Sequence, residues 1–313
     1  MLSDNRLDVV AASLLRTLIY YDVFQYPLTA EEVHRHMDRQ SVSLAEARAS
    51  LSQLVQEGRV YQHDTFYAMR SDVALVERRV RGNDLARKRM KMAHRMSRFI
   101  SRFPYVRAVC LSGSISKDYM EPDGDIDFFI ITEPGRLWIA RTLLVLFKKV
   151  FLLNSYKYFC VNYFIDTDHL EIEEQNVYTA TEVVTLIPTI GASAYAAFRK
   201  ANGWTDAYCP NFPVPAMDAA LDKSDGWGKK LLEAVMNNGL GEWLDDTAMR
   251  FTARHWNRKF KGLRQEDFDR AMKSRKYVSK HHPNDFQKRV LGALQENMRS
   301  FETAHQVALL AYD

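Results

Sequence analysis

The stretch that most constrains this chain is residues 105–132, where two apolar segments flank a glycine turn. The first segment, YVRAVCLSGS, ends at Gly113 and Ser114, and the second, DIDFFIIT, begins with two aspartates. Short apolar runs bounded by glycine and proline predict buried β-strands. Because side chains at i and i+2 of a strand share a face, Asp125 and Asp127 should present their carboxylates side by side.

The segments that follow extend this pair into an α/β unit. RLWIARTLLVLFKKVFLL has the apolar density of a helix packed on a sheet, and YKYFCVNYFI predicts a third strand. Strand, turn, strand, helix, strand is the order of a sheet covered by helices, so we place an α/β core at residues 104–175. Residues 176–313 are predicted to be mainly helical and to shape one side of any site on that core.

The first 70 residues predict three helices followed by a two-stranded hairpin. Thr29 and Glu32 have the spacing of a capping box at a helix start, and Ser43 and Glu46 repeat it. A helix ahead of them, LLRTLIYYDVFQY, should stop before Pro27. RVYQHDTFYAM predicts the two strands. This order is that of a winged helix, so residues 1–70 are expected to form a winged-helix-like domain.

Residues 71–103 concentrate positive charge. VERRVRGNDLARKRMKMAHRMSRFISRF contains ten arginines and lysines and two acids, with the apolar spacing of a helix. Gly82 is the one position where this helix could break. We expect a basic helical connector whose charges lie against acidic neighbours, with nucleic-acid binding as the alternative.

The overall composition describes a multidomain globular protein. The 313 residues are 47% hydrophobic and 26% charged, with a formal charge of +4. No apolar run approaches the roughly 18 residues of a membrane span, so we expect a cytoplasmic protein without a membrane partner. Cys110 and Cys160 fall in strand-like runs and should be buried thiols. The expected fold class is α+β, with a winged helix, a central mixed sheet with flanking helices, and a helical C-terminal region.

Paired carboxylates at a strand entrance point to a particular chemistry. Like charges a few ångströms apart repel, and a bound cation removes that penalty. Mg²⁺ prefers oxygen ligands, is usually held by one or two carboxylates, and leaves other positions for water and substrate phosphates. The turn at Gly113 and Ser114 exposes backbone N–H groups suited to phosphate oxygens. The pattern therefore predicts a metal and phosphate site at Asp125 and Asp127.

The spacing of these residues resembles a known signature. Gly113-Ser114, ten intervening residues, and Asp125-apolar-Asp127-apolar are similar to the motif of the DNA polymerase β-like nucleotidyltransferase superfamily. The resemblance implies that Gly113 and Ser114 contact the β- and γ-phosphates of a nucleoside triphosphate, and that Asp125 and Asp127 bind Mg²⁺ or Mn²⁺. It implies transfer of a nucleoside monophosphate from an NTP, with release of pyrophosphate.

One residue departs from that pattern. The superfamily usually carries a third carboxylate on the next core strand, where this chain has Asn162, and an amide cannot act as a base. Asp166 shares the parity of Asn162 and is our prediction for the catalytic acid, with Glu171 and Glu173 as alternatives. Without such an acid, either the acceptor needs no strong base, or the protein is a catalytically weak or inactive nucleotide-sensing regulator that binds DNA, RNA or a protein partner.

Several cations could contact the nucleotide. We predict nucleotide contacts for Lys117, Arg141 and Lys280, with Arg136 as an alternative to Arg141. Lys280 belongs to a basic cluster, for which the end of a basic helix is the alternative interpretation. The cluster comprises Lys273, Arg275, Lys276, Lys280, His281 and His282.

The acceptor is expected to be a small molecule, because the C-terminal helices are bulky enough to close a pocket. An RNA end and a protein side chain remain open. Sequence-specific DNA binding is weakly supported, because the third predicted helix exposes few cations for phosphates.

Overall fold

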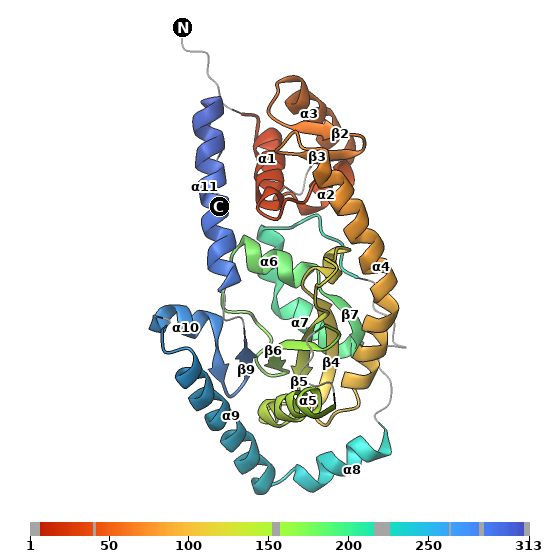
Figure 1. Cartoon of the computed structure of the whole chain (residues 1–313), viewed down its shortest axis with the longest axis vertical. Coiled ribbons are helices and arrows are strands. Elements are labelled where there is room, and N and C mark those ends of the chain that lie inside the picture. The colour runs from red at the N-terminus through yellow and green to blue at the C-terminus, as the bar shows by residue number, and fades with distance from the viewer. Residues whose placement is uncertain are drawn as a thin grey trace.

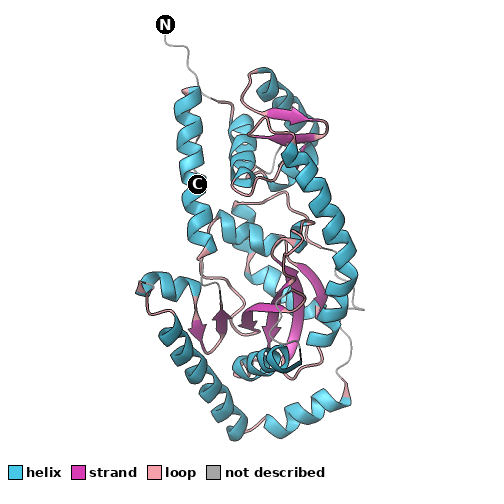
Figure 2. Cartoon of the chain, in the orientation of Figure 1, coloured by secondary structure: helices cyan, strands magenta, loops and turns pink. Residues whose placement is uncertain are grey.

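A computed structural model describes the chain at residues 7–39, 42–151, 157–215, 226–262, 264–281 and 285–309. Figure 1 shows a small N-terminal unit at one end, a larger sheet in the middle, and helices α8 (Trp227–Met236) and α9 (Gly239–Lys259) at the other end. Figure 2 shows that the strands gather in these two sheets and that the rest is mainly helical. The α+β class is as expected.

The N-terminal unit has the predicted order of three helices and a hairpin. Both capping boxes form as expected, at Thr29 with Glu32 and at Ser43 with Glu46. The first helix ends at Asp22, ahead of Pro27. The elements are α1 (Val9–Asp22), β1 (Leu28–Thr29), α2 (Ala30–His36), α3 (Leu44–Gln56), β2 (Tyr61–His63) and β3 (Phe66–Ala68). The sheet order β1-β3-β2 is antiparallel and includes β1, a short strand that was not predicted.

Helix α1 is apolar almost all round because it packs on two sides. Leu14, Leu15 and Leu18 are buried against the rest of the N-terminal unit. The same core includes Val290 and Leu294 of α11 (Phe286–His305), which lies beside α1 in Figure 1. The last helix of the chain therefore anchors the first.

Helix α4 (Ala74–Ile100) forms within residues 71–103, the segment predicted to be a basic helical connector. Gly82 does not break it. A side chain at position 82 would collide with the Tyr119 ring, so glycine here permits close packing. Some of the basic side chains pair with acids, as expected for this helix: Arg78 lies 2.6 Å from Glu121 and Arg79 lies 2.6 Å from Glu32.

The central sheet has six strands in the order β7-β4-β5-β6-β9-β8. Three of them correspond to the predicted strands: β4 (Val106–Ser112), β5 (Asp127–Thr132) and β6 (Cys160–Asp166). Strands β5 and β6 are parallel, and the other neighbours are antiparallel. Cys110 and Cys160 are buried, as predicted.

Among the described residues of the region predicted to be helical, three segments are strands. They are β7 (Ile187–Ile190), β8 (Ser274–Arg275) and β9 (Val278–Lys280). The interpretation of the basic cluster as a helix end is therefore wrong, because β8 and β9 form a hairpin on the edge of the sheet beside β6. Strand β7 contains Pro188, which an edge strand tolerates because one side of its ladder is open.

Helices cover both faces of the sheet. One core cluster joins the sheet to α4 and to α5 (Leu137–Phe151), and another joins it to α6 (Val177–Val184) and α7 (Ala192–Ala201). The described ranges also contain the shorter elements η1 (Ile115–Lys117), η2 (Gly203–Ala207) and α10 (Gln265–Ala271). Within the ranges the structure describes, no helix is long and apolar enough to cross a membrane.

Candidate functional site

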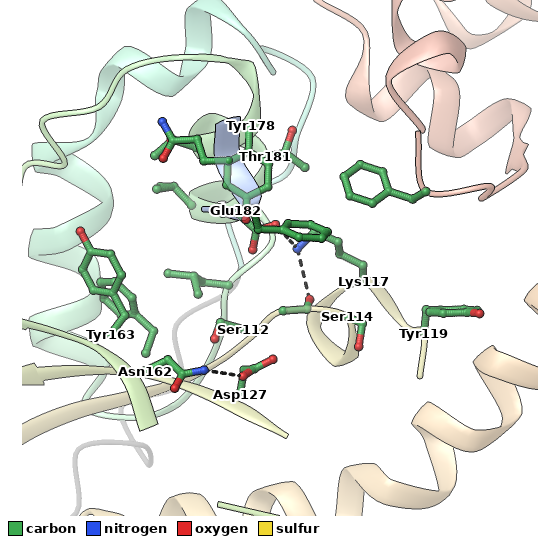
Figure 3. A pocket seen from close by; sticks show the side chains of 18 of the residues that line it. Ser112, Ser114, Lys117, Tyr119, Asp127, Asn162, Tyr163, Tyr178, Thr181 and Glu182 are labelled. Carbon is green, nitrogen blue, oxygen red and sulfur yellow. Dashed lines mark hydrogen bonds and ion pairs between the residues drawn. The ribbon is translucent and has the colours of Figure 1, made fainter. Parts of the chain in front are cut away.

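A cavity of about 610 Å³ lies where the N-terminal unit, the central sheet, α6 and the start of α11 meet. Its polar end contains Gly113, Ser114 and Lys117 from the turn after β4, together with Asp127 of β5 and Asn162 of β6. Figure 3 shows Ser114, Lys117, Asp127 and Asn162 around this end. Four of the predicted site residues, Gly113, Ser114, Lys117 and Asp127, are therefore brought together.

The turn after β4 is shaped to lie against Asp127. Ser112 pairs with Asp127 in the β4–β5 register, so the turn begins directly opposite that carboxylate. Gly113 has φ +66°, a conformation that favours glycine, and a side chain there would collide with the Asp127 carboxylate. The backbone of the turn can therefore approach the acid only with glycine at position 113.

The pKa of the Asp127 carboxyl group is shifted by its surroundings. This pKa is raised to about 6, chiefly by burial and in addition by the negative charges of Asp125 and Glu182, against the lowering effects of the Cys160 thiol and of Lys117. Asp125 precedes β5 and is near enough to act on Asp127, but it is not part of the cavity lining. A perturbed carboxylate facing a cavity is a common property of functional sites.

Asn162 occupies a bulge in β6. In the register with β5, Phe128 pairs with Val161 and Phe129 pairs with Tyr163, which leaves Asn162 unpaired. Bulges re-aim side chains next to sites. Here the Asn162 side-chain amide donates a hydrogen bond of 3.1 Å to Asp127 Oδ1, as Figure 3 shows. Asn162 therefore orients Asp127 but contributes no carboxylate.

Helix α6 supplies an acid that sequence reasoning missed. Glu182 lies 2.9 Å from Lys117 Nζ, and its side chain is 30% exposed. Lys117 Nζ also donates to the carbonyl of Gly113, at 3.2 Å. Tyr178, Thr181 and Glu182 all line the cavity, and their i, i+3, i+4 spacing in YTATE places them on one face of the helix. That spacing was the available signal.

The predicted catalytic acid, Asp166, lies at the other end of its strand. Asp127 pairs with Cys160, whereas Asp166 pairs with Thr132, which separates the two acids by about 20 Å along the strand. Asp166 is buried, accepts a hydrogen bond from the backbone N–H of His169 at 3.0 Å, and lies 2.8 Å from His169 Nδ1. This corrects the predicted role: Asp166 stabilises the turn that follows β6.

The two alternatives to Asp166 also lie away from the cavity. Glu171 is exposed and accepts a hydrogen bond from Gln175, at 3.0 Å. Glu173 forms ion pairs with Lys273 and Arg275. Neither belongs to the cavity lining.

Arg141 is not at the site either. It lies on α5, which packs on the opposite face of the sheet, with its guanidinium 5.4 Å from the Trp138 ring centre and 4.7 Å from that of Trp256. Burial lowers its pKa to about 10. Arg136 is the alternative to Arg141. Its guanidinium carbon lies 5.8 Å from the centre of the Tyr105 ring, and it is likewise outside the cavity lining. The placement corrects the predicted nucleotide contact of Arg141.

Lys280 is the member of the basic cluster that lines the cavity. Its Nζ lies 3.2 Å from Gln287 Oε1, and burial lowers its pKa. Three other members of the cluster form ion pairs elsewhere, His281 lies beside the Trp256 ring, and His282 lies outside the described residues. These pairs join Lys273 to Glu173 and Glu174, Arg275 to Glu173, and Lys276 to Asp245 and Asp246.

The oxygen ligands at Asp127 suit a hard cation whose remaining coordination positions are filled by phosphate oxygens of a substrate and by water. Across the described residues there is no group of three or more His, Cys, Asp or Glu side chains that could hold a metal by themselves. Mg²⁺ does not need such a group, because one or two carboxylates can suffice when phosphates and water complete the shell. A cation beside Asp127 would relieve the repulsion from Asp125 and Glu182 that raises its pKa.

Comparison with known proteins does not identify the chain. No protein-family model, curated protein or solved structure matches it. Function must therefore be inferred from the cavity and the residues around it.

Proposed function

We propose that this protein is a Mg²⁺-dependent nucleotidyltransferase that moves a nucleoside monophosphate from an NTP to a small-molecule acceptor and releases pyrophosphate. The observation that carries the proposal is the close approach of the Gly113 turn to the Asp127 carboxylate inside a cavity. A turn with available N–H groups beside a carboxylate fits a triphosphate that shares a cation with the protein. The signature that includes Ser114 and Asp125 supports the same assignment.

The proposed architecture follows from the same observations. The strand, turn, strand, helix, strand order of β4 to β6 supports a nucleotidyltransferase core, and the helices and hairpin of the N-terminal unit support a winged helix. The winged helix is not proposed to bind DNA, because Arg48, on the exposed side of α3, is paired with Glu31. DNA or RNA remains a weaker proposal for α4.

In the proposed reaction an acceptor oxygen attacks the α-phosphorus. The new bond is oxygen to α-phosphorus, the bond from α-phosphorus to the bridging oxygen breaks, and pyrophosphate leaves. Bound Mg²⁺ would stabilise the developing charge on the phosphoryl oxygens. Lys117 can turn from Glu182 to the triphosphate, which leaves the Glu182 carboxylate to accept the proton of the acceptor.

A transfer assay tests this proposal. The purified protein is incubated with α-³²P-labelled NTPs, Mg²⁺ and a cell extract, and labelled products are counted. We expect Asp127→Asn and Asp125→Asn to reduce labelling by roughly two orders of magnitude, as when a transition-state charge loses its partner. Asp123→Asn is the matched control, an exposed aspartate in the same loop. Equal labelling by wild type and both site variants would refute the proposal.

A second candidate is a nucleotide sensor without turnover. The hydrogen bond from Asn162 to Asp127 favours it, because an amide stands where a third acid would act. Calorimetric titration with a nonhydrolysable ATP analogue and Mg²⁺, followed by a pyrophosphate-release assay with ATP, separates the two candidates. Binding without pyrophosphate release supports the sensor, and release supports the transferase.

A further inference from the structure

The cavity has a second end with a different chemistry. Its lining includes the aromatic side chains of Tyr20, Phe24, Tyr178 and Phe286, and Figure 3 shows Tyr178 on the far side of the view from Asp127. The ring centres of Phe24 and Phe286 are 6.2 Å apart, and those of Tyr178 and Phe286 are 6.3 Å apart. Such rings offer flat apolar surfaces at the distances at which aromatic groups attract one another.

Three distant segments of the chain build this aromatic end. Tyr20 belongs to α1, Phe24 follows the end of α1, Tyr178 lies on α6, and Phe286 opens α11. The elements share one core, in which Val177 packs with residues of α1 and α11. Tyr20 also holds Phe24 in an edge-to-face contact of 5.5 Å. The rings are therefore supported from behind, as a preorganised binding surface requires.

Helix α6 connects the two ends of the cavity. Tyr178 at the aromatic end and Glu182 at the polar end are four residues apart, and one helical turn spans about 5.4 Å. A small molecule with its ring against Tyr178 would therefore place a hydroxyl or amino group near Glu182. Lys117 links Glu182 to the turn at Gly113, because its Nζ pairs with the Glu182 carboxylate and donates a hydrogen bond to the Gly113 carbonyl.

We propose that the aromatic end of the cavity binds the planar ring of a small-molecule acceptor, whose hydroxyl or amino group faces Glu182. The identification of this ligand as the acceptor rests on the proposed function, whereas binding of the ring does not. A cavity of about 610 Å³ lies within the range that encloses drug-sized ligands. On this view the N-terminal unit is a wall of the substrate site, which gives α1 a role other than DNA binding.

The probe for this site is indole, a neutral planar ring with one N–H donor. Its affinity for the full-length protein is measured by saturation-transfer-difference NMR. The variant is Phe286→Ala, at a side chain that is 43% exposed, and the control is Phe251→Ala, at a side chain that is 74% exposed on α9. Phe286→Leu keeps an apolar side chain at this position, so it separates loss of the aromatic ring from loss of the fold.

We expect saturable indole binding that Phe286→Ala weakens roughly three- to tenfold, that Phe286→Leu weakens less, and that Phe251→Ala leaves unchanged. Asp127→Asn should keep indole binding and lose Mg²⁺-ATP binding. The two measurements therefore distinguish failure of the proposed nucleotide site from failure of the proposed ring-binding site. Absence of saturable indole binding, or equal affinity in Phe286→Ala, overturns the proposal. Weakened Mg²⁺-ATP binding in Phe286→Ala with unchanged Mg²⁺-tripolyphosphate binding would assign the rings to the nucleobase and would also overturn it.

Discussion

Lys117 of η1 and Glu182 of α6 form an ion pair of 2.9 Å between two walls of the cavity. The pair joins the turn that follows β4 to a helix some 65 residues later. It brings an acid into the electrostatic range of Asp127, where the strand β6 supplies the Asn162 amide and the Cys160 thiol but no carboxylate. The charge state of Asp127 therefore depends on a helix that is remote in sequence.

Removal of the Glu182 charge should lower the pKa of Asp127. This pKa is raised to about 6, with burial as the largest cause and the negative charge of Glu182 as one of the smaller ones. In Glu182→Gln the added repulsion disappears and Lys117 is free to approach Asp127, so both changes favour the ionised carboxylate. The pKa is measured by ¹³C NMR of labelled aspartate carboxyl groups. Glu171→Gln, at an exposed acid outside the cavity, is the control; an unchanged Asp127 pKa in Glu182→Gln would contradict the account.

Ionisation of Asp127 at neutral pH should lower the free energy of unfolding of the protein. Its folded-state pKa of about 6 lies above the ordinary carboxyl value, so the folded state keeps a proton that the unfolded chain has released. Stability from this group is therefore lost as pH rises from about 4 through about 6. Asp127→Asn should unfold with a free energy about 1 to 2 kcal/mol higher than wild type at pH 8, and with a smaller gain at pH 5.

Urea denaturation at the two pH values measures this difference. Asp123→Asn should show no comparable gain, because that side chain is exposed. A variant Asp127→Asn that is less stable than wild type at pH 8 would show that the half-buried charge of Asp127 is compensated in the folded protein.

The approach of Gly113 to Asp127 can be tested apart from backbone strain. Gly113 and Gly135 have nearly the same φ, +66° and +67°, but only at Gly113 would a side chain meet another group. Alanine at either position should cost about 1 to 2 kcal/mol for the left-handed conformation. Gly113→Ala should additionally displace Asp127 and abolish Mg²⁺-dependent nucleotide binding, which Gly135→Ala should keep. Denaturation and calorimetry together measure both effects, and equal nucleotide affinity in the two variants would refute the role of the close approach.

The packing of α4 on the turn after η1 rests on Gly82. A side chain there would collide with Tyr119, which lines the cavity, whereas the space around Gly292 of α11 is open. Gly82→Ala should destabilise the protein by about 1 to 3 kcal/mol through overpacking. Gly292→Ala should stabilise it by about 0.5 to 1 kcal/mol, the usual gain in a helix interior. Urea midpoints check both signs, and stabilisation by Gly82→Ala would show that α4 and Tyr119 are not in contact.

Local signals predicted the elements whose patterns are complete within a few residues. The capping boxes at Thr29 and Ser43 form because each needs only a side chain three residues away. The apolar runs of β4 and β5 are strands for a similar reason. Strand β7 was missed because it is short and contains Pro188, and β8 and β9 were missed because their pairing depends on β6.

The site residues also differ in whether a local sequence pattern could indicate them. The neighbourhood of Gly113 and Asp127 follows from a short turn between paired strands, so spacing alone could indicate it. Asp166 was misplaced because parity says which face a side chain shares but not how far along the strand it lies. The spacing in YTATE places Glu182 on one face of α6, but Glu182 and Phe286 reach the cavity only through the tertiary packing of α6 and α11, which sequence spacing does not give.

The most direct test of the metal and nucleotide site is calorimetric titration of ATP into wild type, Asp127→Asn and the control Asp123→Asn, with and without Mg²⁺. We expect wild type and Asp123→Asn to bind ATP only with Mg²⁺, and Asp127→Asn to bind at least about tenfold more weakly, a loss of about 1.4 kcal/mol or more. Equal affinity of wild type and Asp127→Asn, or wild-type binding that does not depend on Mg²⁺, would contradict the account.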